Sequence, residues 1–441
     1  MIVRREAGAV VYSGTSVYEG TVQVQVEKVG SEATTAQIAK LIYDSLSEKS
    51  EIQQVTQDMA NRRVKITLGI GAAVFALTQD LNRVASVFLV DYSCALKLST
   101  PVTFKSIMYR AASQGILFKG GSAIEKLVNV DTCVFDKTGT LTYGNMEVTD
   151  VIPLCATNSA KDLLAMAASI EEHSNHPLSQ AVVNAATQHD LPHIDHGEVE
   201  YVIAHGLRTT LNSGQIVMGS RHFLEEHEDV DFSNDEQTIQ EYEALGRHLI
   251  FVSFNGKLIG MLGLRDHLRE DAIETLASLR DLGINELIMI TGDSQFKASI
   301  LGEELKLDRV FAEAVPSAKS SIVESLQAEG KKVMFVGDGV NDAPALTAAD
   351  VGVAMSQGTE LARQVADVVL LHDTLSAVAQ ARELSDIAMK VINSNIKAAE
   401  YINSGIMLAA ALGYLSPAMS ALLHNGTTLS ILGRSAALRH I

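Results

Sequence analysis

The sequence contains no tryptophan and only three cysteines, Cys94, Cys133 and Cys155, which are far apart in the chain. No two of them form a Cys-x-x-Cys pair, so neither a disulfide framework nor a zinc finger is indicated, and a reducing compartment is expected. Basic residues are also scarce, because 35 Lys and Arg stand against 53 Asp and Glu and the formal net charge is −18. This acidic balance argues against nucleic acid as a partner.

The first residues have no apolar run, so no signal peptide is expected, and the chain has no internal repeats or low-complexity tracts. With 441 residues it is long enough for two or three domains. A hydrophobic share of 47% and a mean hydropathy of +0.14 predict membrane segments mixed with water-soluble domains. The candidate segments form two pairs, residues 64–79 with 84–108 and 391–413 with 415–433. Buried helical hairpins of a soluble protein are the alternative interpretation of these segments.

Residues 120–380 alternate short apolar runs with amphipathic stretches, which is typical of a doubly wound α/β sheet. The apolar runs predict strands at 130–135, 247–254, 258–264, 286–291, 332–337 and 351–354. The amphipathic stretches predict helices that include 268–282 and 296–306. Residues 147–245 differ in character and end in a strongly acidic stretch, so we expect them to form a domain inserted after the first strand.

The predicted strand at 130–135 ends at Asp136, which is followed by Lys137, Thr138 and Gly139. In open α/β sheets, ligands bind just beyond the carboxyl ends of the strands. A carboxylate at that position can attack phosphorus and form an aspartyl-phosphate. Taken alone, Asp136 could equally be an acidic residue in an ordinary turn.

Three later motifs favour phosphoryl transfer. Thr291 follows another apolar strand and could hold phosphoryl oxygens, while Lys319 could neutralise their charge. Asp338, also at a strand end, could share one Mg²⁺ with Asp136, with Asp342 holding the site together. The residues expected to carry the chemistry are Asp136, Lys137, Thr138, Thr291, Gly292, Asp293, Lys319, Asn341 and Asp342.

Taken together, the motifs DKTGT at 136–140, TGD at 291–293, Lys319 and GDGVNDAPAL at 337–346 resemble those of the P-type ATPases. The resemblance extends over essentially the whole chain. It implies a haloacid-dehalogenase-like phosphorylation domain in which ATP phosphorylates Asp136. It also implies that Asp136, the Thr138 carbonyl and Asp338 bind Mg²⁺.

The segment 171–178 resembles the His-Pro signature of the heavy-metal-transporting branch. In that branch a His contacts the adenine and a Glu five residues earlier assists it. The nucleotide-binding residues that the resemblance implies are Glu171, His176, Pro177, Gly206 and Gly219.

Residues 91–101 resemble the metal-site helix of the same branch, although only Cys94 remains of its usual Cys-Pro-Cys or Ser-Pro-Cys. Residues 424–428 resemble the His-Glu-Gly segment of one divalent-metal subgroup. The ligands expected for the transported ion are Asp91, Ser93, Cys94, His424 and Thr428. One thiolate, one imidazole and oxygen donors favour Zn, Co, Fe or Mn over Cu(I). For His424, a polar packing contact between helices is the alternative.

The expected fold is an α/β haloacid-dehalogenase-like phosphorylation domain with an inserted α+β nucleotide-binding domain, four transmembrane helices and a remnant of a β actuator domain. The expected boundaries are 1–32 for the actuator remnant, 33–119 for the stalk and two transmembrane helices, 120–146 and 259–378 for the phosphorylation domain, 147–258 for the nucleotide-binding domain, and 379–441 for the last two transmembrane helices.

The family's Thr-Gly-Glu actuator loop, which positions the water for dephosphorylation, has no match here, so an N-terminal truncation is expected. Two functional hypotheses remain. The first is ATP-driven metal export by a multi-pass protein of the bacterial plasma membrane, with Mg²⁺ as cofactor and the catalytic domains in the cytoplasm. The second is a non-transporting fragment that binds ATP or phosphorylates itself, or that joins a separately encoded N-terminal part.

Overall fold

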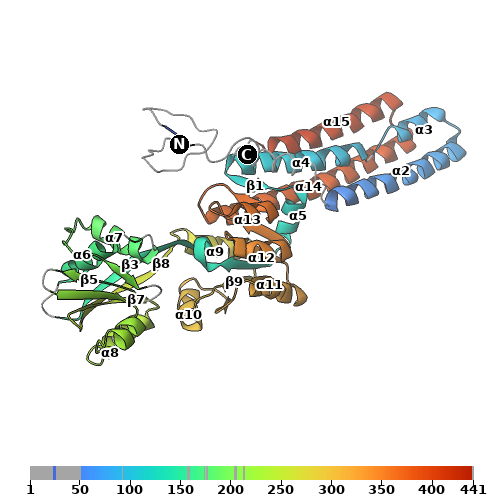
Figure 1. Cartoon of the computed structure of the whole chain (residues 1–441). Helices are drawn as coiled ribbons and strands as arrows, with labels where there is room; N and C mark the ends of the chain where they lie inside the picture. Colours follow the sequence, from blue (N-terminus) through green and yellow to red (C-terminus); the bar gives the residue numbers. More distant parts are fainter. Residues whose placement is uncertain are drawn as a thin grey trace.

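The computed structural model describes residues 23–25, 51–91, 93–155, 159–172, 174, 177–202, 206–211 and 214–439. The predictions for the actuator remnant and for most of the stalk therefore lie almost wholly outside the described residues. Figure 1 shows three parts: a long helical bundle, a central α/β domain beside it, and an inserted domain on the far side of the central domain.

The central domain is built on a seven-stranded sheet in the order β1-β13-β12-β11-β2-β9-β10. All neighbouring strands run parallel except β1, which is antiparallel to β13. The strands are β1 (Ile116–Phe118), β2 (Thr132–Asp136), β9 (Glu286–Ile290), β10 (Arg309–Phe311), β11 (Val333–Gly337), β12 (Val351–Ala354) and β13 (Val368–Leu370). The sheet thus contains four of the strands predicted from the sequence, whereas β1, β10 and β13 were not predicted because each has only three residues.

Helices cover both faces of this sheet, which explains why its central strands are continuous apolar runs. Alternate residues of β2 point to opposite faces: Cys133 and Phe135 join one buried cluster, and Val134 joins another. The helices are α5 (Gly121–Val128), α9 (Ala272–Asp281), α10 (Gln295–Glu304), α11 (Ala318–Ala328), α12 (Ala343–Ala348) and α13 (Glu360–Val365). The predicted helices at 268–282 and 296–306 correspond to α9 and α10.

The inserted domain contains an antiparallel six-stranded sheet in the order β3-β8-β7-β6-β5-β4. Its strands are β3 (Thr142–Pro153), β4 (Glu200–Val202), β5 (Gly206–Leu211), β6 (Gly214–Gly219), β7 (His248–Phe254) and β8 (Lys257–Leu268). Helices α6 (Ala160–Glu171) and α7 (Pro177–Gln188) pack with some residues of the sheet in one apolar cluster. Helix α8 (Glu236–Ala244) packs with other residues of the sheet in a second cluster.

Strands β3 and β8 lead out of the central domain and back into it (Figure 1). They pair with each other from Thr142 opposite Leu268 to Pro153 opposite Gly260. The boundaries expected after residues 146 and 258 therefore both fall inside paired strands. The predicted strand at 258–264 belongs to this second sheet rather than to the sheet that carries Asp136.

The helical bundle consists of α2 (Glu51–Thr78), α3 (Leu81–Phe88), α4 (Ser93–Ser113), α14 (Ser376–Ala411) and α15 (Pro417–Ala437). The apolar stretch predicted at 84–108 is divided, because α3 ends at Phe88 and α4 begins at Ser93. When hydropathy is averaged over windows of 18 residues, no helix of the described part of the chain is long and apolar enough to cross a membrane. The four expected transmembrane helices are therefore not confirmed.

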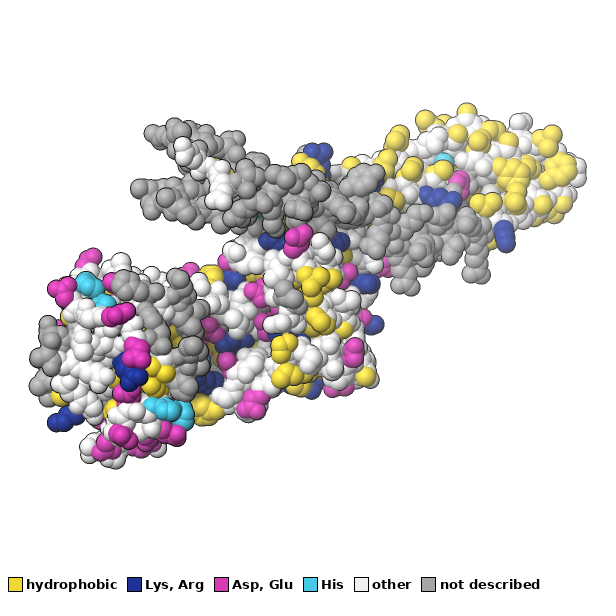
Figure 2. All heavy atoms as spheres, viewed as in Figure 1, with side chains coloured by type: hydrophobic (Ala, Val, Ile, Leu, Met, Phe, Trp, Pro, Cys, Tyr) yellow, Lys and Arg dark blue, Asp and Glu magenta, His cyan; other side chains and the backbone are white. Residues whose placement is uncertain are grey.

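Polar and apolar side chains are sorted unusually in this bundle. Most of the large apolar side chains that the described protein exposes lie on it, including Leu77 at 85% and Leu81 at 71% exposure. Figure 2 shows hydrophobic side chains gathered over the end of the bundle that lies away from the central domain. The buried polar residues described in these helices are Ser86, Ser99, Thr100, Thr103, Ser106, Arg382, Ser385, Asn395, Asn403, Ser420, His424, Thr428 and Ser435.

Candidate active site

Asp136 is the last residue of β2 and lies between the carboxyl ends of β9 and β11. Its neighbours in the sheet are apolar and fully covered, so the carboxylate is held at the sheet edge with only 8% of its surface exposed. The next residues, Lys137–Leu141, form a tight turn in which Gly139 has φ +78°. The strand therefore delivers the carboxylate, and the glycine turns the chain away immediately behind it.

Three carboxylates meet at this edge: oxygens of Asp136, Asp338 and Asp342 all lie within 4.8 Å of one another. The Lys319 ammonium donates to Asp136 Oδ1 at 2.8 Å and to Asp342 Oδ1 at 2.6 Å. The other oxygen of Asp342 accepts the backbone N–H groups of Asp338 at 3.1 Å and Gly339 at 2.9 Å. Both oxygens of Asp342 are therefore used in holding Lys319 and the 337–339 turn in place.

The electrostatic balance of the cluster is negative. Burial and the neighbouring charge of Asp342 raise the pKa of Asp136 to about 6, although Lys319 opposes the shift. Burial and Asp342 likewise raise the pKa of Asp338 to about 6. Burial would lower the pKa of Lys319, but Asp136 and Asp342 outweigh it and raise that pKa, so Lys319 is a cation. One ammonium facing three carboxylates leaves an excess of negative charge that a divalent cation would relieve.

The donor atoms of the cluster suit Mg²⁺, which is a hard ion that binds oxygen ligands. The Gly139 backbone approaches so closely that a Cβ atom there would lie 1.9 Å from Asp338 Oδ2. Any residue larger than glycine at position 139 would displace the Asp338 carboxylate. Thr138, which is exposed, belongs to the same turn. The residues present therefore fit the expected magnesium site.

The other expected catalytic residues lie in the turns around the three carboxylates. Lys137 does not face Asp136: its ammonium pairs with Asp293 at 2.7 Å and with Asp266. Thr291 is buried after β9, and its hydroxyl accepts the backbone N–H of Asp293 at 3.1 Å. Gly292 lies exposed between them, and Asn341 is exposed in the short turn Val340–Asp342. The Lys137–Asp293 pair thus ties the 291–293 turn to the turn that follows Asp136.

Arg269 was not predicted, yet it is the largest of the fully buried side chains among the described residues. Its guanidinium donates to the Gly139 carbonyl at 3.1 Å and to Asp373 Oδ1 at 2.8 Å. It also lies over the Tyr143 ring, 4.6 Å from the centroid. Arg269 therefore holds the turn behind Asp136 by its Gly139 carbonyl. Because it stands in an ordinary charged stretch, no sequence pattern marks it.

The chain is similar to several known proteins. Residues 130–350 match the haloacid dehalogenase-like hydrolase family. The chain is 35% identical over 433 residues to a zinc-exporting P-type ATPase of Mycobacterium marinum, covering 98% of this chain and 59% of that protein. It is 34% identical over 432 residues to a manganese-exporting P-type ATPase of Mycobacterium tuberculosis, covering 96% and 60%. The chain belongs to the heavy-metal P-type ATPase family.

The structure is also similar to the crystal structure of a zinc-transporting PIB-type ATPase in its E2·Pi state. The TM-score is 0.78 at 28% sequence identity, and the match covers 94% of this chain and 69% of that one. The chain spans about three fifths of the length of the P-type ATPases of M. marinum and M. tuberculosis.

For the nucleotide site expected from the sequence, the structure brings two glycines together. Gly206 in β5 and Gly219 in β6 are direct partners across the two strands. A Cβ atom at Gly206 would lie 2.3 Å from the Met218 carbonyl oxygen, so close strand packing is reason enough for a glycine there. Glu171 is buried at the end of α6, and Pro177 begins α7. His176, between them, lies outside the described residues.

Of the residues expected to bind the transported ion, His424 and Thr428 are buried in the helical bundle, Asp91 is half-buried and Cys94 is exposed. Cys94 Sγ lies 3.4 Å from Asp91 Oδ2. Asn403 connects the helices, because its amide donates to the Asp91 carbonyl at 3.3 Å and its Oδ1 lies 3.4 Å from His424 Nδ1. Thr428 donates to the His424 carbonyl at 3.1 Å. The side chain of Ser93 lies outside the described part.

Asn403, from α14, was not among the predicted ligands, although it links the Asp91 segment to His424. Within the described residues, two groups of three His, Cys, Asp or Glu ligands lie within 4.8 Å of one another, and neither includes Cys94 or His424. Asn403 thus links the half-buried Asp91 segment to the buried His424, but the expected ligands do not form a closed set and Cys94 is exposed.

Proposed function

We propose that this chain carries the phosphorylation, nucleotide and ion sites of an ATP-driven transition-metal exporter, and that ATP phosphorylates Asp136. The observation that carries the proposal is the bridge from Lys319 to Asp136 and Asp342 beside Asp338. It combines a buried carboxylate, an adjacent cation and an oxygen-only metal site at the end of a parallel strand. A structural ion pair would not require the three carboxylates or the close approach of Gly139.

In this reaction one oxygen of Asp136 is held by Lys319, and the other is the nucleophile. It forms a bond to the γ-phosphorus of ATP while the bond from that phosphorus to the β,γ-bridging oxygen breaks, and ADP leaves with the electron pair. Asp136 and Asp338 would hold Mg²⁺, which when bound neutralises charge on the phosphoryl group. Lys319 adds a second positive charge, and hydrolysis of the acyl phosphate returns the free carboxylate.

The sorting of side chains in the helical bundle supports a location in the membrane. Most of the exposed large apolar side chains lie on the bundle, whereas polar residues of α3, α4, α14 and α15 are buried in it beside apolar ones. The bundle therefore has a surface suited to lipid and buried polar groups suited to an ion pathway. Averaging hydropathy along a helix mixes these two kinds of residue and lowers its apparent apolarity. The bundle would place the ion site in the lipid bilayer, with the sheet domains on the cytoplasmic side where ATP is found.

The phosphorylation step is tested by Asp136→Asn, with labelled ATP and Mg²⁺ added to the full chain. The expected result is loss of an acid-stable, hydroxylamine-sensitive phosphoenzyme, because an amide is a poor nucleophile and the acyl phosphate cannot form. Asp281→Asn is the matched control, since Asp281 is an exposed carboxylate at the end of α9. Normal labelling of Asp136→Asn would refute the assignment of the nucleophile.

The transported ion is tested by adding Zn²⁺, Co²⁺, Fe²⁺, Mn²⁺ and Cu⁺ one at a time and measuring phosphoenzyme formed in membrane vesicles. Zinc and manganese lead the candidates, because relatives are named as exporters of these metals and the donors are of mixed hardness. Cys94→Ala and His424→Ala should each abolish metal stimulation and leave ATP binding unchanged. Ser430→Ala is the control, since Ser430 is exposed on the same helix as His424. Unchanged metal stimulation in both variants would refute the assignment of Cys94 and His424 as ligands of the transported ion.

A further inference from the structure

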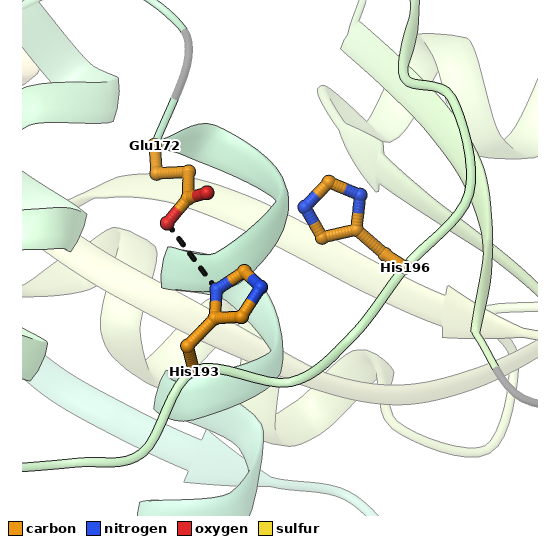
Figure 3. A group of neighbouring side chains, drawn as sticks. All are labelled: Glu172, His193 and His196. Atoms are coloured by element: carbon orange, nitrogen blue, oxygen red, sulfur yellow. Dashed lines mark ion pairs between the residues drawn. The ribbon is translucent and has the colours of Figure 1, made fainter.

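A second group of metal-binding side chains lies in the inserted domain, far in the sequence from the carboxylates of the active site. Ligand atoms of Glu172, His193 and His196 all lie within 4.8 Å of one another. Figure 3 shows the three side chains facing one another, Glu172 from the turn after α6 and the two histidines from the segment after α7. The reaction proposed for Asp136 uses none of them.

The spacing is close to that of ligands on one ion. Glu172 Oε2 lies 3.2 Å from His193 Nδ1. Two tetrahedral ligands with bonds of about 2.0–2.1 Å to zinc are separated by roughly 3.3–3.4 Å. The side chains of His193 and Glu172 are 47% and 38% exposed, so small rotations would bring the third ligand to the same distance.

The tautomer of His196 is set by its own backbone. His196 Nδ1 lies 2.7 Å from the Gly197 carbonyl oxygen. A carbonyl only accepts, so Nδ1 carries the proton and Nε2 carries the lone pair that binds a metal. In metal-binding histidines, the ring nitrogen that does not bind the metal usually donates a hydrogen bond of this kind, and the bond orients the imidazole.

The backbone around the histidines is anchored to the rest of the inserted domain. The Ile194 N–H donates to the hydroxyl of Ser169, a buried residue of α6, at 2.9 Å. The Gly197 N–H donates to the Thr210 carbonyl at 2.8 Å. Because Glu172 directly follows α6, these bonds hold all three ligands on one scaffold, and little order has to be gained when an ion binds.

We propose that Glu172, His193 and His196 bind a divalent transition-metal ion of the zinc class, with water completing the coordination. Two imidazoles and one carboxylate suit such an ion, whereas Mg²⁺ prefers oxygen ligands alone. The ion ties the end of α6 to the segment between α7 and β4. The site is separate from both the magnesium site at Asp136 and the ion pathway in the helical bundle, and it does not depend on the proposed transport.

The test is zinc binding to the full chain by equilibrium dialysis, in excess Mg²⁺ to saturate the oxygen-only site. His193→Ala and His196→Ala should each lower the bound zinc by one equivalent. His189→Ala is the control, because this exposed histidine is in the same segment but outside the cluster, and it should bind as much zinc as the unmodified chain. With Co²⁺ as probe, both cluster variants should lose a visible absorption band that His189→Ala keeps.

Hydrogen exchange on the same proteins locates the effect. Zinc should slow amide exchange in residues 189–197 of the unmodified chain and of His189→Ala, and should have no effect there in the two cluster variants. Exchange of β2 amides, unchanged in all the proteins, would show that the variants are folded. Equal zinc stoichiometry in all the proteins would overturn the proposal and leave Glu172 and His193 as a surface ion pair.

Discussion

Replacing Arg269 by alanine should damage the active site without touching a reacting atom. The substitution removes the hydrogen bonds to the Gly139 carbonyl at 3.1 Å and to Asp373 Oδ1 at 2.8 Å, and a third to the Asp373 carbonyl at 3.2 Å. Among the described residues, the Asp373 carboxylate then keeps only the hydroxyl of Ser356, at 3.1 Å, as a donor. The turn behind Asp136 loses the support of Arg269.

The magnitude follows from the burial of the pair. Breaking a buried ion pair costs about 3–5 kcal/mol. Water can rehydrate Asp373 once its partner is removed, because its side chain is 34% exposed, and this favours the lower end of the range. A loss of about 3 kcal/mol corresponds to a roughly 100-fold larger population of the locally opened state, and amide exchange becomes faster by the same factor. Loosening the turn that positions the nucleophile should slow phosphorylation by about 100-fold as well.

The assay combines amide exchange in β2 and β11 with the initial rate of phosphoenzyme formation. Arg280→Ala is the matched control: Arg280 also bonds a carboxylate and a carbonyl, Asp308 Oδ2 and the Lys306 oxygen, both at 2.8 Å, but it is on the surface. Surface pairs contribute about 0–1 kcal/mol, so the control should change exchange by less than about fivefold. Arg269→Lys should be intermediate, because it keeps the charge and loses the planar fork. Equal effects of Arg269→Ala and Arg280→Ala would refute the reasoning.

The remaining predictions concern a glycine and a half-buried acid of the central domain. Gly139→Ala should abolish phosphorylation, because its Cβ would lie 1.9 Å from Asp338 Oδ2, whereas Gly144→Ala should keep most of it, since that glycine has a similar φ of +71° but no atom nearer than 3.5 Å. Equal loss of phosphoenzyme in both variants would mean that backbone strain alone explains the effect. Burial raises the pKa of Asp367 in the folded protein, although its carboxylate accepts the Gly352 N–H at 2.9 Å. Its ionised form therefore costs stability above the unfolded pKa of about 3.9, and this cost disappears as the pH falls. Asp367→Asn should raise the urea midpoint, followed by circular dichroism, at pH 7 and leave it nearly unchanged at pH 4; a lowered midpoint at both would contradict the assignment.

Local patterns were sufficient for the strands that carry the chemistry. Each of these strands is a short apolar run that ends in a polar turn, and the structure contains all six predicted strands close to their expected bounds. Buried parallel strands are easy to predict because both faces are apolar. Placing 258–264 in a sheet was less simple. Strand β8 is apolar like the others, and only its pairing with β3 and β7 assigns it to the inserted domain.

The proximity of the carboxylates of Asp136, Asp338 and Asp342 was also predictable. Asp136 is the last residue of β2 and Asp338 directly follows β11, and these two strands are parallel neighbours, so the two carboxylates meet at the carboxyl ends of the strands. The role of Lys319 is less local, since it is 183 positions from Asp136 and reaches the site only because α11 packs behind the sheet. Lys319 was assigned to the site because of its resemblance to the motifs of a known family, since the residues around it in sequence do not indicate this role.

The sequence by itself determined where polar side chains follow buried strands, because the alternation of apolar and polar residues and the glycine turns act over only a few residues. Only the tertiary structure decided which distant groups meet. Arg269 lies 130 positions from Gly139, and His193 lies 21 positions from Glu172, each in a stretch whose composition is that of an ordinary surface. The physical reason is that a charge is buried, or a ligand set is closed, by contacts between elements, and the residues on either side of a group in sequence do not record those contacts.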